Sequence, residues 1–171
     1  NRIHNENPLT KENLSKMYNQ LELITEKILP GETIDTVAYG CTSGTIAIGE
    51  DRVIEKIQKA KPGCYVTTPI TSAIKAFKKM NVKKIVVFTP YPEPVNKTIS
   101  EYLINKNIQI ISFNSFNLDL DSDIAKVDPK HLSNTLAKLN MNDADALFVS
   151  CTALPALKII EEVEKKINKP V

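Results

Sequence analysis

The hydrophobic pattern of the chain alternates between helical spacing and short continuous apolar runs. Apolar residues recur every three to four positions from Leu14 to Ile28, which predicts a helix closed by Pro30 and Gly31. The clearest continuous run, Ile85–Phe88, is typical of a central parallel strand that is covered on both faces. The strands predicted in this way cover residues 34–39, 64–66, 85–88, 108–113 and 145–150.

Helical patterns occupy the stretches between these strands. Thr68 is a predicted N-cap, followed by Pro69 in the first helical position. The expected buried face of that helix comprises Ala73, Ile74, Phe77 and Met80. Further helices are predicted over residues 14–28, 50–60, 129–139 and 155–167, and one ends near residue 105. Strands and helices in alternation indicate an α/β protein with parallel sheet and right-handed crossovers.

One short sequence design occurs twice. Residues 35–42 and 145–152 each run from an Asp through a short apolar stretch to a Cys-Thr pair, with the cysteine six positions after the Asp. Each predicts a buried strand that ends in a thiol, Cys41 or Cys151, just before a helix begins. Backbone N–H groups and the helix dipole favour negative charge there, so we expect both thiols to have a lowered pKa. The recurrence indicates two related lobes, residues 1–84 and residues 85–171.

Two thiols facing each other across a cleft suit chemistry at a carbon that bears a carboxylate. One thiolate removes a proton or attacks, and the other thiol donates a proton from the opposite face. Hydroxyls of Thr42, Ser43 and Thr152 could hold the carboxylate, and they could equally cap helices. A cysteine at the end of an apolar strand is also commonly a small buried hydrophobe, so inert packing of Cys41 and Cys151 stays open.

Other polar residues follow predicted strands. The Tyr91 hydroxyl either reaches a substrate oxygen or covers the core, and Asn96 is assigned to the following helix. Cys64 lies inside a short strand and is predicted to be structural. Weaker candidates for polar contacts are Asn114, Ser115 and Asn117.

The composition narrows the class of protein. With 171 residues, 42% of them hydrophobic, the chain can bury a core as one domain or two small lobes. Lys and Arg (22) nearly balance Asp and Glu (20), and the lysines are scattered, which argues against nucleic-acid binding. No apolar run approaches the roughly 20 residues of a membrane span, and no signal-peptide pattern is present, so we expect a soluble, cytoplasmic protein. Three separated cysteines make a poor disulfide framework, and reduced thiols are expected.

Metal and nucleotide chemistry have little support in the sequence. His4 and His131 are isolated and no Cys-x-x-Cys spacing occurs, so no metal site is expected. The chain has neither a P-loop nor a Gly-x-Gly-x-x-Gly motif. The segment 40–44 could seat a small anion.

Several motifs together resemble the aspartate/glutamate racemase superfamily, and its maleate cis–trans isomerase, arylmalonate decarboxylase and ectoine-utilisation branch in particular. The motifs are Tyr39–Thr45, Ile48–Glu50, Thr67–Thr71, Phe88–Tyr91 and Ser150–Leu154, with Arg2–Thr10 similar to the ectoine-utilisation proteins. The resemblance implies flavodoxin-like lobes related by a pseudo-twofold, an active site between them and catalysis without a cofactor. It also implies that Cys41 and Cys151 are the catalytic thiols. The implied carboxylate-binding residues are Thr42, Ser43, Tyr91 and Thr152.

The resemblance also bears on the reaction. Racemases and isomerases of the group use both thiols, whereas its decarboxylases use one, so this chain is expected to be a racemase or isomerase acting on a small carboxylate, dicarboxylate or amino acid. A single-thiol decarboxylase, a non-catalytic carboxylate-binding module and a redox-sensing thiol pair are the alternatives. The family's first strand would lie before Asn1 and its closing segment after Val171, so the fold is expected to be incomplete at both ends. A homo-oligomer is compatible with this class, and neither nucleic acid nor a membrane is an expected partner.

Overall fold

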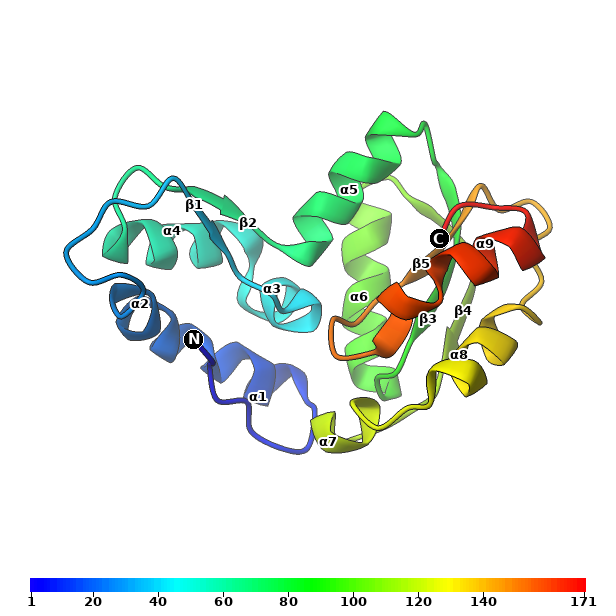
Figure 1. Ribbon diagram of the computed structural model, residues 1–171, viewed down its shortest axis with the longest axis horizontal. Helices are drawn as coiled ribbons and strands as arrows, with labels where there is room; N and C mark the ends of the chain where they lie inside the picture. The colour runs from blue at the N-terminus through cyan, green and yellow to red at the C-terminus, as the bar shows by residue number, and fades with distance from the viewer.

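The fold contains two separate parallel sheets with helices packed around them (Figure 1). A computed structural model describes the whole chain, Asn1–Val171. The first sheet pairs β1 (Thr36–Ala38) with β2 (Tyr65–Thr67), and the second has the order β4-β3-β5. Its strands are β3 (Lys84–Thr89), β4 (Gln109–Ser115) and β5 (Ala146–Val149). The predicted α/β class with parallel sheets is therefore confirmed, while the lobe boundary, the pseudo-twofold and the incomplete ends stay predictions.

Strand β3 occupies the centre of the second sheet, as its continuous apolar pattern predicted. It pairs with β4 on one side and β5 on the other, and Ile85, Val86 and Val87 are each 0% exposed. The carboxylate of Asp145, just before β5, accepts the backbone N–H groups of Lys83 and Lys84 at 2.8 Å each. Asp145 therefore fixes the position at which β5 begins to pair with β3.

The predicted helix over residues 14–28 is two helices, α1 (Lys11–Lys16) and α2 (Tyr18–Glu26). Two helices also follow β1, namely α3 (Thr42–Ile48) and α4 (Glu50–Ala60), separated by Gly49 with φ +101°. Helix α1 packs on α3, and α2 packs on α4. The break between α1 and α2 at Met17 therefore lies beside the break between α3 and α4 at Gly49. Apolar spacing alone could not reveal that bend.

Helix α5 (Pro69–Lys79) begins with the predicted cap. The Thr68 hydroxyl accepts the N–H of Thr71, whose side chain in turn accepts the N–H of Thr68. Met80, predicted to lie on the buried face, is 50% exposed because the helix ends at Lys79 and Met80 is its C-cap.

The helices of the second half are α6 (Glu93–Asn105), α7 (Asp121–Ile124), α8 (Pro129–Leu136) and α9 (Ile160–Ile167). Helix α8 stops three residues before its predicted end. The helix predicted to start at Pro155 begins as the 3₁₀ turn η1 (Pro155–Lys158) and becomes α-helical only from Ile160. None of the helices is long and apolar enough to cross a membrane.

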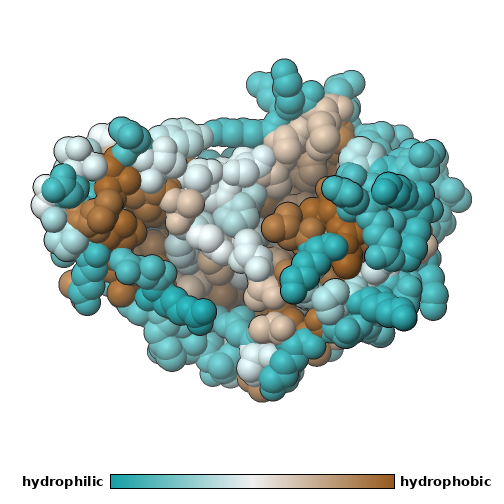
Figure 2. Space-filling model, viewed as in Figure 1, coloured by the Kyte–Doolittle hydropathy of each residue, from teal (hydrophilic) through white to brown (hydrophobic).

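Exposed hydrophobic residues gather in two places on the face shown in Figure 2, over α2 with the loop after it and near η1. Leu23, Leu29 and Leu157 are 56%, 63% and 86% exposed. Most of the remaining face is hydrophilic.

Polar contacts join the two halves of the chain along a seam. The Thr152 hydroxyl donates to the Gly40 carbonyl at 2.7 Å, and the Tyr102 hydroxyl donates to Glu50 at 3.2 Å. Just before α1, the Leu9 N–H donates to the Asp119 carbonyl at 3.0 Å. Helix α3 also packs on α6, so the segment after β1 lies at the junction of the two sheets.

The two equivalent aspartates before β1 and β5 give a stability prediction. The backbone N–H groups of Lys83 and Lys84 hold the pKa of Asp145 below its ordinary value, whereas the exposed Asp35 side chain makes no hydrogen bond. A carboxyl whose folded pKa is depressed stabilises the fold above its unfolded pKa of about 3.9, and this contribution is lost as the pH falls through the folded pKa. Asp145→Asn should therefore lower the Tm at pH 7 by a few degrees, and this difference should shrink only as the pH falls below about 4, through the depressed folded pKa.

Thermal unfolding monitored by circular dichroism from pH 2 to 8 measures this difference. Asp35→Asn is the matched control and should leave the Tm unchanged. A deficit in Asp145→Asn that persists undiminished at pH 2 would contradict the proposed role of the charge.

Candidate active site

A cavity of about 510 Å³ lies between the helices of the first half and the turns that follow β1 and β5. Its walls include both predicted catalytic thiols and the four predicted carboxylate-binding residues, namely Cys41, Thr42, Ser43, Tyr91, Cys151 and Thr152. Cys64 is outside the cavity wall and 1% exposed, as expected of a structural residue. The structure therefore brings the two thiols into one cavity although they are far apart in the sequence. The roles assigned to these residues stay predictions.

Cys41 is held at the start of α3. Its Sγ caps the helix by accepting the N–H of Gly44 at 3.3 Å, and the Ser43 hydroxyl lies 3.8 Å from it. Position 44 has no room for a side chain, because a Cβ there would lie 2.5 Å from Met17 Cε, 2.6 Å from the Tyr39 hydroxyl and 2.9 Å from Cys41 Sγ. Glycine at this position lets the helix begin directly against the thiol.

Cys151 is held differently, by a turn rather than by a helix. The Leu154 N–H donates to the Cys151 carbonyl at 3.2 Å, and the hydroxyl of Tyr91 and the backbone N–H groups of Ala153 and Leu154 act to lower the pKa of its thiol. The prediction that both thiols lie at the start of a helix is thus correct for Cys41 and wrong for Cys151. The reason is local, since Pro155 opens a 3₁₀ turn and the α-helix begins only at Ile160.

The thiols have raised pKa values, so the predicted lowering is wrong. Burial raises the pKa of Cys41, and the Gly44 N–H and the Ser43 hydroxyl offset this only in part. Burial likewise raises the pKa of Cys151, against the opposing effect of the Tyr91 hydroxyl. The sequence indicated the N–H donors correctly but not the extent of desolvation, which disfavours a thiolate.

Negative charges add to this effect. A thiolate at Cys151 raises the pKa of Cys41, and the carboxylate of Asp121 raises the pKa of both thiols. Burial also raises the pKa of Tyr91 well above its ordinary value, so its hydroxyl stays protonated and can donate a hydrogen bond. The cavity therefore disfavours a thiolate at either cysteine, and disfavours two thiolates at once still more.

The backbone of Tyr91 is fixed on both sides. Its N–H donates to the Thr89 hydroxyl at 3.2 Å, and its carbonyl accepts from the Asn96 amide at 2.7 Å and from the Ser115 hydroxyl. Asn96 lies in α6, as predicted, and Ser115 supports the loop instead of contacting a substrate. Two further polar candidates, Asn114 and Asn117, are not part of the cavity wall.

The predicted carboxylate-binding hydroxyls have different surroundings. Thr42 and Ser43 are buried in the first turn of α3. Thr152 is exposed, and its hydroxyl proton is engaged by the Gly40 carbonyl, which leaves only its lone pairs for a ligand. Thr152 thus links the turn carrying Cys151 to the residue before Cys41.

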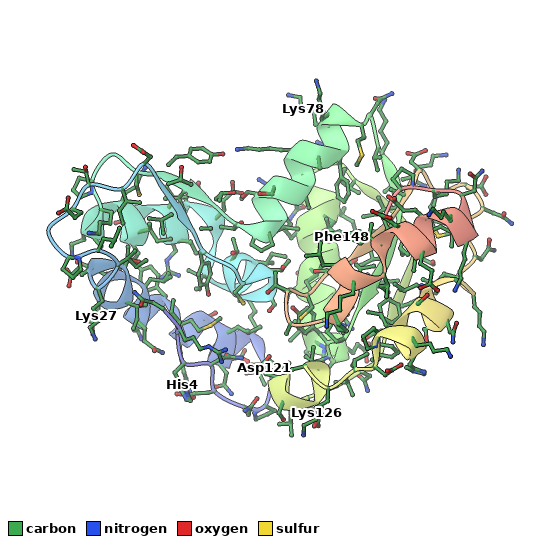
Figure 3. All side chains as sticks on the ribbon, in the orientation of Figure 1. His4, Lys27, Lys78, Asp121, Lys126 and Phe148 are labelled. Atoms are coloured by element: carbon green, nitrogen blue, oxygen red, sulfur yellow. The ribbon has the colours of Figure 1, made fainter.

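Sequence reasoning did not assign several polar residues of the wall to the site, among them Arg2, Asn5, Tyr39 and Asp121. Asp121 belongs to an Asn- and Asp-rich stretch that is usually solvated, and Asn5 reaches it over 116 positions by a 2.8 Å hydrogen bond. Figure 3 shows Asp121 where α7 approaches α1. No local pattern signals such a pair. His, Cys, Asp and Glu side chains form no group of three or more that could hold a metal ion.

Comparison with known proteins gives a consistent class. The family model described as arylmalonate decarboxylase matches residues 34–171. A maleate isomerase from Alcaligenes faecalis is 25% identical over 146 residues, covering 81% of this chain and 58% of that protein. Among solved structures, the maleate isomerase Iso from Pseudomonas putida S16 has a TM-score of 0.86 at 21% identity, covering 97% of this chain and 70% of its own.

Another solved structure shows the same fold with a covalent adduct. It is the Nocardia farcinica maleate cis–trans isomerase, a cysteine-to-serine mutant with a covalently bound succinylcysteine intermediate. Its TM-score is 0.85 at 17% identity, covering 96% of this chain and 70% of that one.

The chain belongs to the arylmalonate decarboxylase family, in the maleate isomerase and arylmalonate decarboxylase branch of the aspartate/glutamate racemase-like proteins. This confirms the resemblance found in the motifs. The chain spans 58% of the length of the Alcaligenes faecalis relative.

The raised pKa values predict how the thiols react. Because only the thiolate is nucleophilic, alkylation of Cys41 and Cys151 by iodoacetamide should be slower at pH 7 than that of free cysteine, whose pKa is about 8.5. The rates should still be rising above pH 9. Peptide mass spectrometry across pH 6–10 measures each site separately, with the buried Cys64 as an unlabelled control. Saturation of either rate below pH 8 would contradict the raised values.

Because the two thiols have different partners, one substitution should change the reactivity of Cys151 alone and another that of Cys41 alone. Tyr91→Phe removes a hydroxyl that lowers the pKa of Cys151, so it should move the labelling midpoint of Cys151 upwards and leave that of Cys41 nearly unchanged. Ser43→Ala should do the reverse, since its hydroxyl lowers the pKa of Cys41. The same alkylation assay distinguishes the two variants. Equal shifts at both thiols would show one shared network in place of two separate ones.

Proposed function

We propose that the full-length protein is a cofactor-independent isomerase or racemase that acts on a small carboxylate, dicarboxylate or amino acid. Cys41 and Cys151 are its two catalytic thiols. The observation that carries the proposal is the convergence of both thiols on one cavity from turns that follow two different sheets. Thr42, Ser43 and Tyr91 bind the carboxylate beside the reacting carbon, and Thr152 joins them when its hydroxyl turns from the Gly40 carbonyl to the substrate.

The electrostatics support a division of labour between the thiols. Two thiolates in one partly buried site repel each other, so the reactive form of the pair has one thiolate and one protonated thiol. The thiolate removes a proton from the carbon next to the carboxylate, or adds to an unsaturated carbon. The protonated thiol supplies a proton to the intermediate, and the carboxylate carries the developing negative charge with help from the Tyr91 hydroxyl and the N–H groups of the turns. In the addition route, rotation about the new single bond is followed by return of a proton to the second thiolate and loss of the first thiolate, which re-forms the double bond and restores both thiols.

The relatives support isomerisation in particular. Maleate isomerases are similar over most of this chain, and one structural neighbour carries a succinyl group on a cysteine, which is the product of thiol addition to an unsaturated dicarboxylate. These relatives extend beyond the part that this chain covers, so the proposal concerns the full-length protein.

A single-thiol decarboxylase is the second candidate. The family model matched by residues 34–171 is described as arylmalonate decarboxylase. The presence of a cysteine in both turns favours the two-thiol reaction. In a non-catalytic carboxylate-binding module, neither thiol would matter for chemistry.

Substitution of each cysteine separates these functions. In the full-length protein, Cys41→Ser and Cys151→Ser should each lower turnover by about 10²- to 10⁴-fold, the usual contribution of a general acid or base. Cys64→Ser is the control and should keep turnover within about threefold if it folds normally, since it does not reach the cavity.

The assay follows solvent deuterium incorporation and isomer interconversion by NMR, with a chelator present, on maleate, aspartate, glutamate, diamino acids and an arylmalonate. Loss of activity from only one cysteine variant would favour the decarboxylase. Activity that survives both substitutions, or that appears only with added metal or pyridoxal phosphate, would refute the thiol-pair reaction.

A further inference from the structure

The cavity wall carries one cationic and one anionic side chain, Arg2 and Asp121. Neither takes part in an ion pair within the protein. The side chain of Asp121 has a single hydrogen-bond partner, the amide nitrogen of Asn5 at 2.8 Å. The carboxylate therefore keeps free lone pairs at the cavity wall.

The Asn5 amide adds a second acceptor beside it. Its nitrogen is used by Asp121, and its Oδ1 is buried without any donor. Buried polar atoms are nearly always paired, so this oxygen calls for a donor that the protein itself does not supply. Asp121 and Asn5 therefore place a carboxylate without a cationic partner next to an unpaired amide oxygen.

A second anion would be poorly placed there. Asp121 already disfavours thiolate formation at Cys41 and Cys151, which shows that its charge acts on both reacting positions. A carboxylate of a substrate lying against Asp121 would add further repulsion, whereas a cation would offset the charge and favour the thiolate. The chemistry that fits this wall is a group with N–H donors and a positive charge.

We propose that Asp121 and the Asn5 amide oxygen form a subsite for a substrate ammonium group, so that the substrate is an amino acid in its zwitterionic form. Arg2 and the hydroxyls of Thr42 and Ser43 hold its carboxylate. This inference deepens the proposed function and rests on it for the reaction, but binding at the subsite requires neither thiol to react.

Matched pairs of ligands test the subsite directly. In each pair the ammonium group of an amino acid is replaced by a hydroxyl at the same carbon: aspartate and malate, glutamate and 2-hydroxyglutarate, alanine and lactate. Isothermal titration calorimetry on the full-length protein should show at least one amino acid that binds more tightly than its hydroxy acid. If no amino acid in the panel does so, the proposal is overturned.

Substitutions at the subsite sharpen the test. Asp121→Asn keeps the shape and an acceptor for Asn5 but removes the charge, so it should weaken binding of the preferred amino acid by about ten- to a hundredfold. Binding of the matched hydroxy acid should be unchanged or tighter. Asp121→Glu keeps the charge and should retain the preference. The control is Asp123→Asn on the same helix, because Asp123 lies outside the cavity wall and near Lys126.

Failure of the subsite and failure of the proposed function are distinguishable. The double variant Cys41→Ser/Cys151→Ser should lose turnover and keep the preference for the ammonium group. If solvent exchange does not require the thiols but the preference for the ammonium group persists, the thiol reaction is refuted and the subsite is retained. Thiol-dependent turnover combined with an unchanged ligand preference in Asp121→Asn would refute the subsite alone.

Discussion

The tight packing around Gly44 is the constraint on which the candidate site depends. Met17, Tyr39 and Cys41 all approach this glycine closely enough to exclude a Cβ. The same contact places the bend between α1 and α2 beside the start of α3 and directs the Gly44 N–H at the Cys41 thiol. Close packing of this kind transmits small volume changes, so the first thiol and the helix bend are parts of one arrangement.

Much of the fold could be predicted because its patterns are local. The apolar run of β3 and the Thr68 cap each depend on a few neighbouring residues. The convergence of Cys41 and Cys151 could also be predicted, since parallel strands present their carboxyl ends at the edge where ligands bind. The bend at Met17 could not, because it results from packing against helices about thirty positions later.

The electrostatics of the site were the least accessible to sequence reasoning. The turns supply N–H donors to both thiols as expected, but the degree of burial depends on chain segments from both halves of the molecule. Asp121 and Asn5 meet only through the tertiary fold. A charged or polar residue in a loop has no sequence signature that separates a solvated position from a cavity wall.

The two thiols have different partners, a helix N–H and a serine for Cys41, and a phenol and a turn for Cys151. As acids they are therefore unequal, and under the proposed reaction each would serve one direction of the conversion. An enzyme cannot alter the equilibrium constant of its reaction, which for two mirror-image substrates is one. Any difference in kcat between the two directions must then be matched by the same ratio in KM, so the asymmetry of the site would be visible in saturation behaviour and absent from kcat/KM.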